Sequence, residues 1–311
     1  MKTALITHAD CLAHQVPDDN PEKPERLRRV LAAMEGPDFA GLIRLEAPLA
    51  DDRDILRVHD RQMWADMAGK EPATPGEFHE ITYDTFLHTG ALTAARRAAG
   101  AGLRGAKGVF DGEFEAAFCA VRPPGHHAEP RQMMGFCFAG SAAITAMWAV
   151  EEGHARRAAV IDFDVHHGNG TQAAFWSRPE LFFGSIHKAP LYPNTGHPHE
   201  RGEHDNIRNA PFGAGISAQA WRDLAEESLL GPLDAFAPDL LVISAGFDAH
   251  RDDPLGAGPV TEEDFAWITG RLVDIARRHG QGRLVSLMEG GYDLDALARS
   301  AAAHVRALLD A

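Results

Sequence analysis

The sequence predicts an α/β fold, in which a central, mostly parallel sheet is covered by helices on both faces. Six short apolar runs lack the alternation of polar and apolar residues seen in half-exposed strands, which is typical of strands buried on both faces. Between these runs lie longer segments in which apolar residues recur with the spacing of a helix. Regular alternation of strands and helices indicates parallel pairing.

The expected elements follow one another along all 311 residues. We expect strands where the apolar runs stand, at residues 3–7, 116–121, 158–163, 181–186, 239–245 and 283–288. We expect helices where the apolar spacing is helical, at residues 24–35, 86–100, 141–152, 220–230, 261–279 and 294–308. Residues 188–215, rich in Pro, Gly, Asn and His, are predicted to form a long irregular loop that carries function. No repeat, low-complexity tract or shift in composition divides the chain, so residues 1–311 are predicted to form a single domain.

Charge and cysteine content narrow the classes of function and the compartment. The 45 acidic residues outnumber the 30 Lys and Arg residues, and a net charge of −15 argues against binding to nucleic acid or to an anionic membrane. The three cysteines form no C-x-x-C pair, which argues against a disulfide framework and favours a reducing compartment. The N-terminal apolar run is too short for a signal peptide, and no stretch approaches the ~20 apolar residues of a membrane helix. We therefore expect a cytoplasmic protein.

The strongest local signal follows the third expected strand. Asp162, Asp164 and His166 are each two residues apart, so on an extended chain they point to the same side. Asp248 follows the fifth expected strand in a similar way. Sites in parallel sheets form beyond the carboxyl ends of strands, and catalytic zinc uses three protein ligands of this kind. Singly, each Asp could cap a helix, but together Asp164, His166 and Asp248 indicate a zinc site.

Two adjacent histidines, His126 and His127, follow the second expected strand and a stiff Arg-Pro-Pro-Gly segment. Histidine is the usual general acid–base group near neutral pH. A carboxylate partner keeps an imidazole cationic more readily than an amide does, so one histidine could stay charged while the other exchanges protons. Taken alone, the segment could equally be a surface turn.

Two further segments carry aromatic residues that suit a site. Tyr292 follows the last expected strand and a Glu-Gly-Gly segment, where its hydroxyl could donate a hydrogen bond to a developing oxyanion or simply pack on the next helix. Gly135 and Phe136 lie in a Met-Gly-Phe-Cys-Phe segment. An aromatic beside a glycine could form the wall of a narrow channel, and core packing is an equal alternative.

Taken together, these segments resemble the histone deacetylase family, in particular its class II-like and bacterial members, over nearly the whole chain. Five motifs occur in the order that the family has them: Pro-Glu-Lys-Pro-Glu-Arg-Leu at 21–27, Arg-Pro-Pro-Gly-His-His-Ala at 122–128, Asp-Phe-Asp-Val-His-His-Gly-Asn-Gly-Thr at 162–171, Ala-Gly-Phe-Asp at 245–248 and Glu-Gly-Gly-Tyr at 289–292. The first of them departs from the family pattern, because Asn20 stands where His usually precedes the motif. The resemblance implies the arginase/deacetylase-like fold, with a central, mostly parallel sheet of about eight strands.

The resemblance also implies two kinds of bound metal. It assigns one catalytic zinc ion per chain to Asp164, His166 and Asp248, the residues that the spacing indicates. It further implies a structural potassium ion, whose ligands would be Asp162, main-chain oxygens of Asp164 and His166, and the residues Ser185 and Ile186.

The same resemblance implies a role for each catalytic residue. His127 would act as general base and then as general acid, with His126 as a charged or hydrogen-bonding helper. Asp162 would orient His126, and Asn169 would orient His127. Tyr292 would stabilise the oxyanion together with the zinc ion.

An acylated amine is the substrate that the resemblance implies. Gly135 and Phe136 would form one wall of a tunnel, and Tyr192 the other, where Phe is more usual. Relatives specialised for acetylpolyamines can carry Glu at the position of Leu255. Leu at this position favours acyl-lysine in a peptide or protein, with a small-molecule amide such as an acetylpolyamine as the alternative.

Other interpretations are weaker. A dimanganese ureohydrolase needs further bridging carboxylates, and Gly168 stands where one would be required. A non-catalytic acyl-binding module is disfavoured because the three zinc ligands, His127 and Tyr292 are all present. The loop histidines His197, His199 and His204 lack a framing strand and are interpreted as a solvated loop rather than a second metal site. Whether copies of the chain form a homo-oligomer is left open.

Overall fold

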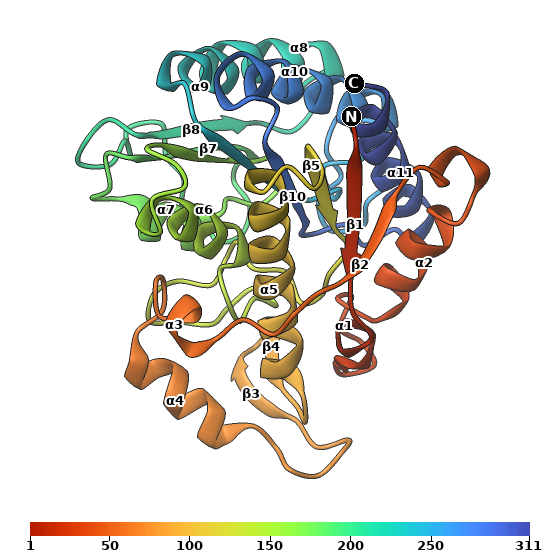
Figure 1. Ribbon diagram of the computed structural model, residues 1–311. Coiled ribbons are helices and arrows are strands. Elements are labelled where there is room, and N and C mark those ends of the chain that lie inside the picture. Colours follow the sequence, from red (N-terminus) through yellow and green to blue (C-terminus); the bar gives the residue numbers. More distant parts are fainter.

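The computed structural model describes residues 1–311, and a single large parallel sheet lies at its centre (Figure 1). Its strands are β1 (Thr3–Thr7), β2 (Ile43–Glu46), β5 (Ala116–Cys119), β6 (Ala158–Asp162), β7 (Leu181–Lys188), β8 (Ile207–Phe212), β9 (Leu240–Ala245) and β10 (Leu284–Met288). The order across the 8-stranded sheet is β2-β1-β5-β10-β9-β6-β7-β8, and every neighbouring pair is parallel. A separate antiparallel hairpin is formed by β3 (His79–Thr82) and β4 (Thr85–Leu87).

Helices cover both faces of the sheet, as the sequence predicts (Figure 1). They are α1 (Ala9–Ala13), α2 (Glu25–Ala33), α3 (Asp52–Ile55), α4 (Arg61–Lys70), α5 (Ala91–Phe110), α6 (Ser141–Glu151), α7 (Asn169–Phe175), α8 (Ala218–Ala225), α9 (Gly231–Phe236), α10 (Glu262–Gly280) and α11 (Leu294–Asp310), with a 3-10 turn η1 (Pro37–Phe39) and a π turn η2 (Glu226–Leu230). Helices α5 and α6 pack together on one face, while α2, α10 and α11 pack together on the other. None of these helices combines the length and the apolar character needed to cross a membrane.

The central strands explain the apolar runs in the sequence. Every residue of β5, β6, β9 and β10 is buried. A strand covered on both faces cannot alternate between core and solvent, so it is apolar throughout. The predicted fold class is confirmed.

Two predicted helices differ from the observed ones. The helix expected at 86–100 begins only at Ala91, because Gly90 has φ 89° and its left-handed backbone separates the hairpin from α5. The helix expected at 220–230 changes to the π turn η2 at Glu226.

Both edge strands of the sheet escaped prediction. Residues 207–212, expected within an irregular loop, form β8, which as an edge strand tolerates Pro211. Strand β2 is short and alternates between half-buried and exposed residues, so it lacks the continuous apolar run of a central strand.

Four consecutive strands of the sheet, β5, β10, β9 and β6, run in the same direction. The segments that follow their carboxyl ends therefore meet at one edge of the sheet. Those four segments carry the histidine pair, Tyr292, Asp248 and the Asp164–His166 pair.

Candidate active site and metal centre

The side chains of Asp164, His166 and Asp248 converge at the carboxyl ends of β6 and β9. His166 Nδ1 lies 3.0 Å from Asp164 Oδ1 and 3.1 Å from Asp248 Oδ2. One ligand atom from each residue lies within 4.8 Å of the other two. Zinc bonds of about 2.0–2.1 Å at a tetrahedral centre separate ligand atoms by about 3.3 Å, so the three groups can bind one ion.

Main-chain groups hold the two carboxylates in place. Gly290 N donates to Asp164 Oδ2 at 2.8 Å, and Val165 N donates to Asp248 Oδ1 at 2.8 Å. A Cβ atom on Gly290 would collide with both carboxylates, so this position needs glycine for steric reasons. The Glu-Gly-Gly-Tyr segment therefore helps to hold the candidate metal ligands as well as supplying Tyr292.

The electrostatics of this group favour a bound cation. Burial and the neighbouring Asp164 raise the pKa of Asp248 to about 7. Burial alone would lower the pKa of His166, but its bonds to Asp164 and Asp248 raise it to about 10. Two buried carboxylates so close together stabilise positive charge between them. A nitrogen donor beside two oxygen donors suits zinc better than magnesium or calcium, which prefer oxygen ligands.

The two histidines have different partners, as their expected roles require. His126 Nδ1 lies 2.9 Å from Asp162 Oδ2, whereas His127 Nδ1 lies 2.8 Å from Asn169 Oδ1. Burial lowers the pKa of His126, but Asp164 and Asp162 outweigh it and raise the pKa well above its usual value. Burial, followed by the charge of His126, lowers the pKa of His127 well below its usual value. The two rings therefore differ in their tendency to carry a proton, and His126 holds one more readily than His127 does.

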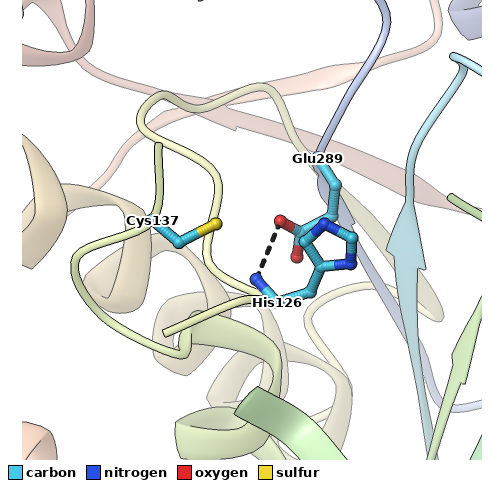
Figure 2. A group of neighbouring side chains, drawn as sticks. All are labelled: His126, Cys137 and Glu289. Atoms are coloured by element: carbon cyan, nitrogen blue, oxygen red, sulfur yellow. Dashed lines mark hydrogen bonds between the residues drawn. The ribbon is translucent and has the colours of Figure 1, made fainter. Parts of the chain in front are cut away.

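A second group of potential metal ligands is formed by His126, Cys137 and Glu289, next to the segment with the two histidines at residues 125–127, here called the histidine loop (Figure 2). Figure 2 shows the Glu289 carboxylate directed at the main-chain nitrogen of His126, with Cys137 nearby. Glu289 Oε2 accepts hydrogen bonds from Gly125 N at 2.6 Å and His126 N at 3.2 Å, and Oε1 accepts one from Ser244 Oγ at 3.1 Å. Because these donors satisfy both oxygens, Glu289 fixes the histidine loop rather than binding a metal.

A cavity of about 430 Å³ leads to this edge of the sheet. Its lining includes His127, His166 and Tyr292, and all four residues that were expected to contact substrate, namely Gly135, Phe136, Tyr192 and Leu255. The rings of Phe136 and Tyr292 meet edge to face at 5.9 Å, and the ring of Tyr192 lies 5.0 Å from that of His127. Leu255 is partly exposed at 41%.

A buried network holds the loop that carries Tyr292. Arg26 donates to the main-chain oxygens of Glu289 at 2.5 Å and Gly291 at 2.6 Å, and its guanidinium carbon lies 4.9 Å from the centre of the Tyr292 ring. Glu22 Oε1 accepts from both Arg26 at 2.8 Å and Arg122 at 2.6 Å. The motif at residues 21–27 therefore holds the main chain of the segment that carries Tyr292, a role that the sequence analysis did not assign to it.

The residues expected to bind potassium lie on the neighbouring strands β6 and β7 and in the segment just after β6. Asp162 Oδ1 accepts from Asp164 N at 3.0 Å. In the parallel register of β6 and β7, Asp162 lies opposite Ser185, and Ile186 follows on the same strand. All of these residues except His166 are completely buried, and His166 is nearly so.

Several residues of the site were given no role there from the sequence. The Asp253 carboxylate accepts hydrogen bonds from the main-chain nitrogens of Tyr292 at 2.7 Å and Leu255 at 2.9 Å. Glu129 Oε1 accepts one from the side-chain Nδ2 of Asn169 at 2.7 Å. The cavity is also lined by residues of the N-terminal loop, the β3–β4 hairpin and the loop after β7, namely Asp19, Asn20, Pro21, Tyr83, Asp84, Phe86 and Leu191.

Comparison with known proteins agrees with this geometry. A family model described as histone deacetylase domain matches residues 20–308. A protein named "Probable deacetylase" from Archaeoglobus fulgidus is 34% identical over 304 residues, covering 95% of this chain and 82% of that protein. A "Histone deacetylase-like amidohydrolase" from Pseudomonas aeruginosa is 34% identical, covering 87% of this chain and 72% of that protein. The crystal structure of the HDA15 HD domain aligns with TM-score 0.92 and 31% identity over 99% of this chain and 88% of that one. The chain belongs to the histone deacetylase family.

Proposed function

We propose that this protein is a zinc-dependent hydrolase that removes acetyl or other acyl groups from lysine-like amines. The observation that supports this most strongly is the convergence of Asp164, His166 and Asp248 beside a neutral, correctly oriented His127 in one cavity. The family supports amide hydrolysis, since the named relatives include deacetylases and an amidohydrolase.

The metal proposed for this site is one zinc ion per chain, held by Asp164, His166 and Asp248. When bound, zinc supplies Lewis acidity that polarises a carbonyl and lowers the pKa of water from ~15.7 towards about 7. A two-metal ureohydrolase is disfavoured, because Gly168 contributes no carboxylate and the oxygens of Glu289 are already hydrogen-bonded.

His127 is proposed as the general base and then the general acid. Asn169 Oδ1 can only accept, so it holds the hydrogen of His127 on Nδ1 and leaves Nε2 free to take a proton. The lowered pKa of His127 keeps that nitrogen unprotonated before reaction. Nε2 then takes a proton from the attacking water and returns it to the leaving amine.

His126 and Tyr292 are proposed to stabilise negative charge as it develops. His126 stays cationic because Asp162 and Asp164 lie beside it. Burial raises the pKa of the Tyr292 hydroxyl well above its usual value, so the hydroxyl keeps its proton and can donate a hydrogen bond to an oxyanion.

The substrate is proposed to be an acyl-lysine side chain of a peptide or protein. Phe136, Gly135 and Tyr192 line the cavity and would enclose an extended alkyl chain, while Leu255 at the mouth offers no charge to a distal amine. A small cationic amide such as an acetylpolyamine is the second candidate, because Asp19 and Asp84 also line the cavity and could bind a distal ammonium group.

We further propose that Asp162, Ser185, Ile186 and the main chain of Asp164 and His166 bind a structural potassium ion. The register of Asp162 opposite Ser185 supports this assignment. A lower melting temperature after exchange of K⁺ for Na⁺ would support it, and equal melting temperatures in both salts would remove it.

The chain is also proposed to be one catalytic domain that works in the cytoplasm. One cluster of 81 buried apolar residues draws on segments from Ala4 to Leu308, which supports a single domain. Cys11, Cys119 and Cys137 are all unpaired, which supports a reducing compartment.

Zinc content and turnover would test the proposed function together. We expect one zinc ion per chain by elemental analysis and hydrolysis of an acetyl-lysine peptide that stops on chelation and returns with zinc. Asp248→Asn should lose both zinc and turnover. Two metal ions per chain, or binding of the peptide without hydrolysis, would contradict the proposal. Exclusive cleavage of acetylputrescine would show that the substrate is a small cationic amide and not a peptide.

A further inference from the structure

We propose that Glu129 is a positioning residue that fixes the side-chain amide of Asn169 and, through it, the tautomer of His127. This inference depends on the function proposed above, in which His127 Nε2 must be free to accept a proton. Glu129 does not line the cavity, and its side chain is hydrogen-bonded to Asn169 and to none of the proposed metal ligands. Its effect on the reaction would therefore pass entirely through Asn169.

The three residues form a linear chain of hydrogen bonds. Asn169 Nδ2 donates to Glu129 Oε1 at 2.7 Å, and Asn169 Oδ1 lies 2.8 Å from His127 Nδ1. Asn169 and His127 are buried, with 5% and 4% of their surfaces exposed. Met134 Sδ, a weak acceptor, lies 3.5 Å from Asn169 Nδ2 and also favours the amino group on that side.

An asparagine amide has two orientations of nearly the same shape, related by exchange of its oxygen and nitrogen. In the inverted orientation, the amino group would donate to His127 Nδ1. The ring hydrogen would then move to Nε2, the nitrogen that must accept a proton. A histidine in this tautomer cannot serve as the base.

Glu129 excludes the inverted orientation. A carboxylate has acceptors only, so inversion would place the Asn169 oxygen against the Glu129 oxygen in a partly buried place, where neither oxygen would have a donor. No other charged group is hydrogen-bonded to the Asn169 side chain. The geometry thus points to Glu129 as the group that selects between the two tautomers.

The main chain of Glu129 is held independently of its side chain. Its nitrogen donates to Gln132 O at 2.9 Å, and its carbonyl oxygen lies 3.1 Å from His59 Nδ1. Glu129→Gln keeps the length of the side chain and these main-chain bonds. A glutamine amide can present either a donor or an acceptor, so it no longer penalises inversion of Asn169.

A double-mutant cycle of Glu129→Gln with Asn169→Asp tests the inference on the zinc-loaded enzyme with an acetyl-lysine peptide. In the wild type, Glu129→Gln should lower kcat about tenfold and leave KM within about twofold, because the tautomer and not substrate binding is affected. Asn169→Asp alone should lower kcat further, since it places a carboxylate against Glu129. In the double variant the amide at position 129 donates to the new carboxylate, so Glu129→Gln should raise kcat in this background.

The chain offers a matched control. His167 Nε2 lies 3.1 Å from Gln172 Oε1, and Gln172 Nε2 donates to Glu200 Oε2 at 2.8 Å, a similar chain of histidine, amide and carboxylate in which Glu200 Oε2 also accepts from Gly196 N at 3.2 Å. Glu200→Gln should leave kcat within about twofold. An equal loss from Glu200→Gln and Glu129→Gln would show a general effect on the loops and would overturn the inference.

Nitrogen-15 NMR of the histidine rings gives a second measurement that needs no turnover. With His127→Ala used for assignment, the wild type should show hydrogen on Nδ1 of His127, and Glu129→Gln should shift the ring towards the other tautomer. An unchanged tautomer, or independent losses in the double-mutant cycle, would overturn the role of Glu129. If the wild type hydrolysed no acylated amine but Glu129→Gln shifted the tautomer, the proposed function would fail while the role of Glu129 stood.

Discussion

Tyr292→Phe removes one hydroxyl and leaves its surroundings in place. The aromatic ring is held by the Arg26 guanidinium, 4.9 Å from its centre, and by Phe136, 5.9 Å away ring to ring. The main-chain nitrogen of residue 292 is held by Asp253 at 2.7 Å. Phenylalanine keeps all three contacts, so the substitution isolates the hydroxyl.

The expected loss follows from the role of that hydroxyl. One donor aimed at a developing oxyanion is worth about 2.7–4 kcal/mol, which corresponds to a decrease in kcat of about 10²- to 10³-fold. The interaction forms only in the transition state, so KM should change by less than about threefold. Zinc content should remain that of the wild type, because Tyr292 is not among the converging ligands.

Steady-state hydrolysis of an acetyl-lysine peptide, with zinc measured on the same samples, checks this prediction. Urea unfolding of both proteins should agree within about 1 kcal/mol, which excludes a general loss of structure. A variant that kept its zinc and its fold and turned over within about threefold of the wild type would refute an oxyanion role for Tyr292.

Three further predictions concern groups around the site and in the core. Gly290→Ala should weaken zinc binding by about tenfold or more, because the added Cβ would collide with the carboxylates of Asp164 and Asp248. A zinc titration against a chelating dye measures the affinity, and an unchanged affinity would contradict the prediction. Asp253→Asn should lower kcat by about tenfold, because an amide has one acceptor oxygen, whereas Asp253 uses both carboxylate oxygens to hold the main chain at Leu255 and Tyr292. Steady-state kinetics, with circular dichroism spectra that match the wild type, would test this, and a wild-type kcat would count against it. Burial lowers the pKa of His304 in the folded protein to about 3. In the unfolded chain this histidine takes up a proton as the pH falls below about 6.5, so its full contribution to stability is present above pH 6.5 and is lost progressively towards pH 3. The free energy of unfolding, measured with urea, should therefore fall by about 1–2 kcal/mol less in His304→Gln than in the wild type when the pH is lowered from 7 to 5. Equal decreases in both proteins would contradict this cause.

The central strands, and the convergence of Asp164, His166 and Asp248 at one edge of the sheet, were predictable for one physical reason. Strands buried on both faces are continuously apolar, and a charged residue directly after such a run marks the end of the strand and a functional edge of the sheet. The alternation of Asp162, Asp164 and His166 then predicts that Asp164 and His166 point to the same side, and the family resemblance implies their role as ligands.

What could not be predicted depends on contacts between distant segments. The edge strands β2 and β8 have no continuous apolar run, because one side or one end meets solvent. Asp253 and Glu129 stand among ordinary loop residues, and their partners Tyr292 and Asn169 are 39 and 40 positions away. Nothing within either loop specifies which distant donor the carboxylate will meet.

The sheet order separates the chemistry of this enzyme from the choice of its substrate. The segments that follow the adjacent strands β5, β10, β9 and β6 each carry one part of the candidate site, so its side chains are anchored to the fully buried centre of the sheet. Three segments outside these strand ends, namely the N-terminal loop, the β3–β4 hairpin and the loop after β7, line much of the rest of the cavity, together with Gly135, Phe136 and Leu255. For an engineer, these three loops are exchangeable parts: grafting them from relatives should retune acyl-chain length and partner choice without disturbing the metal centre.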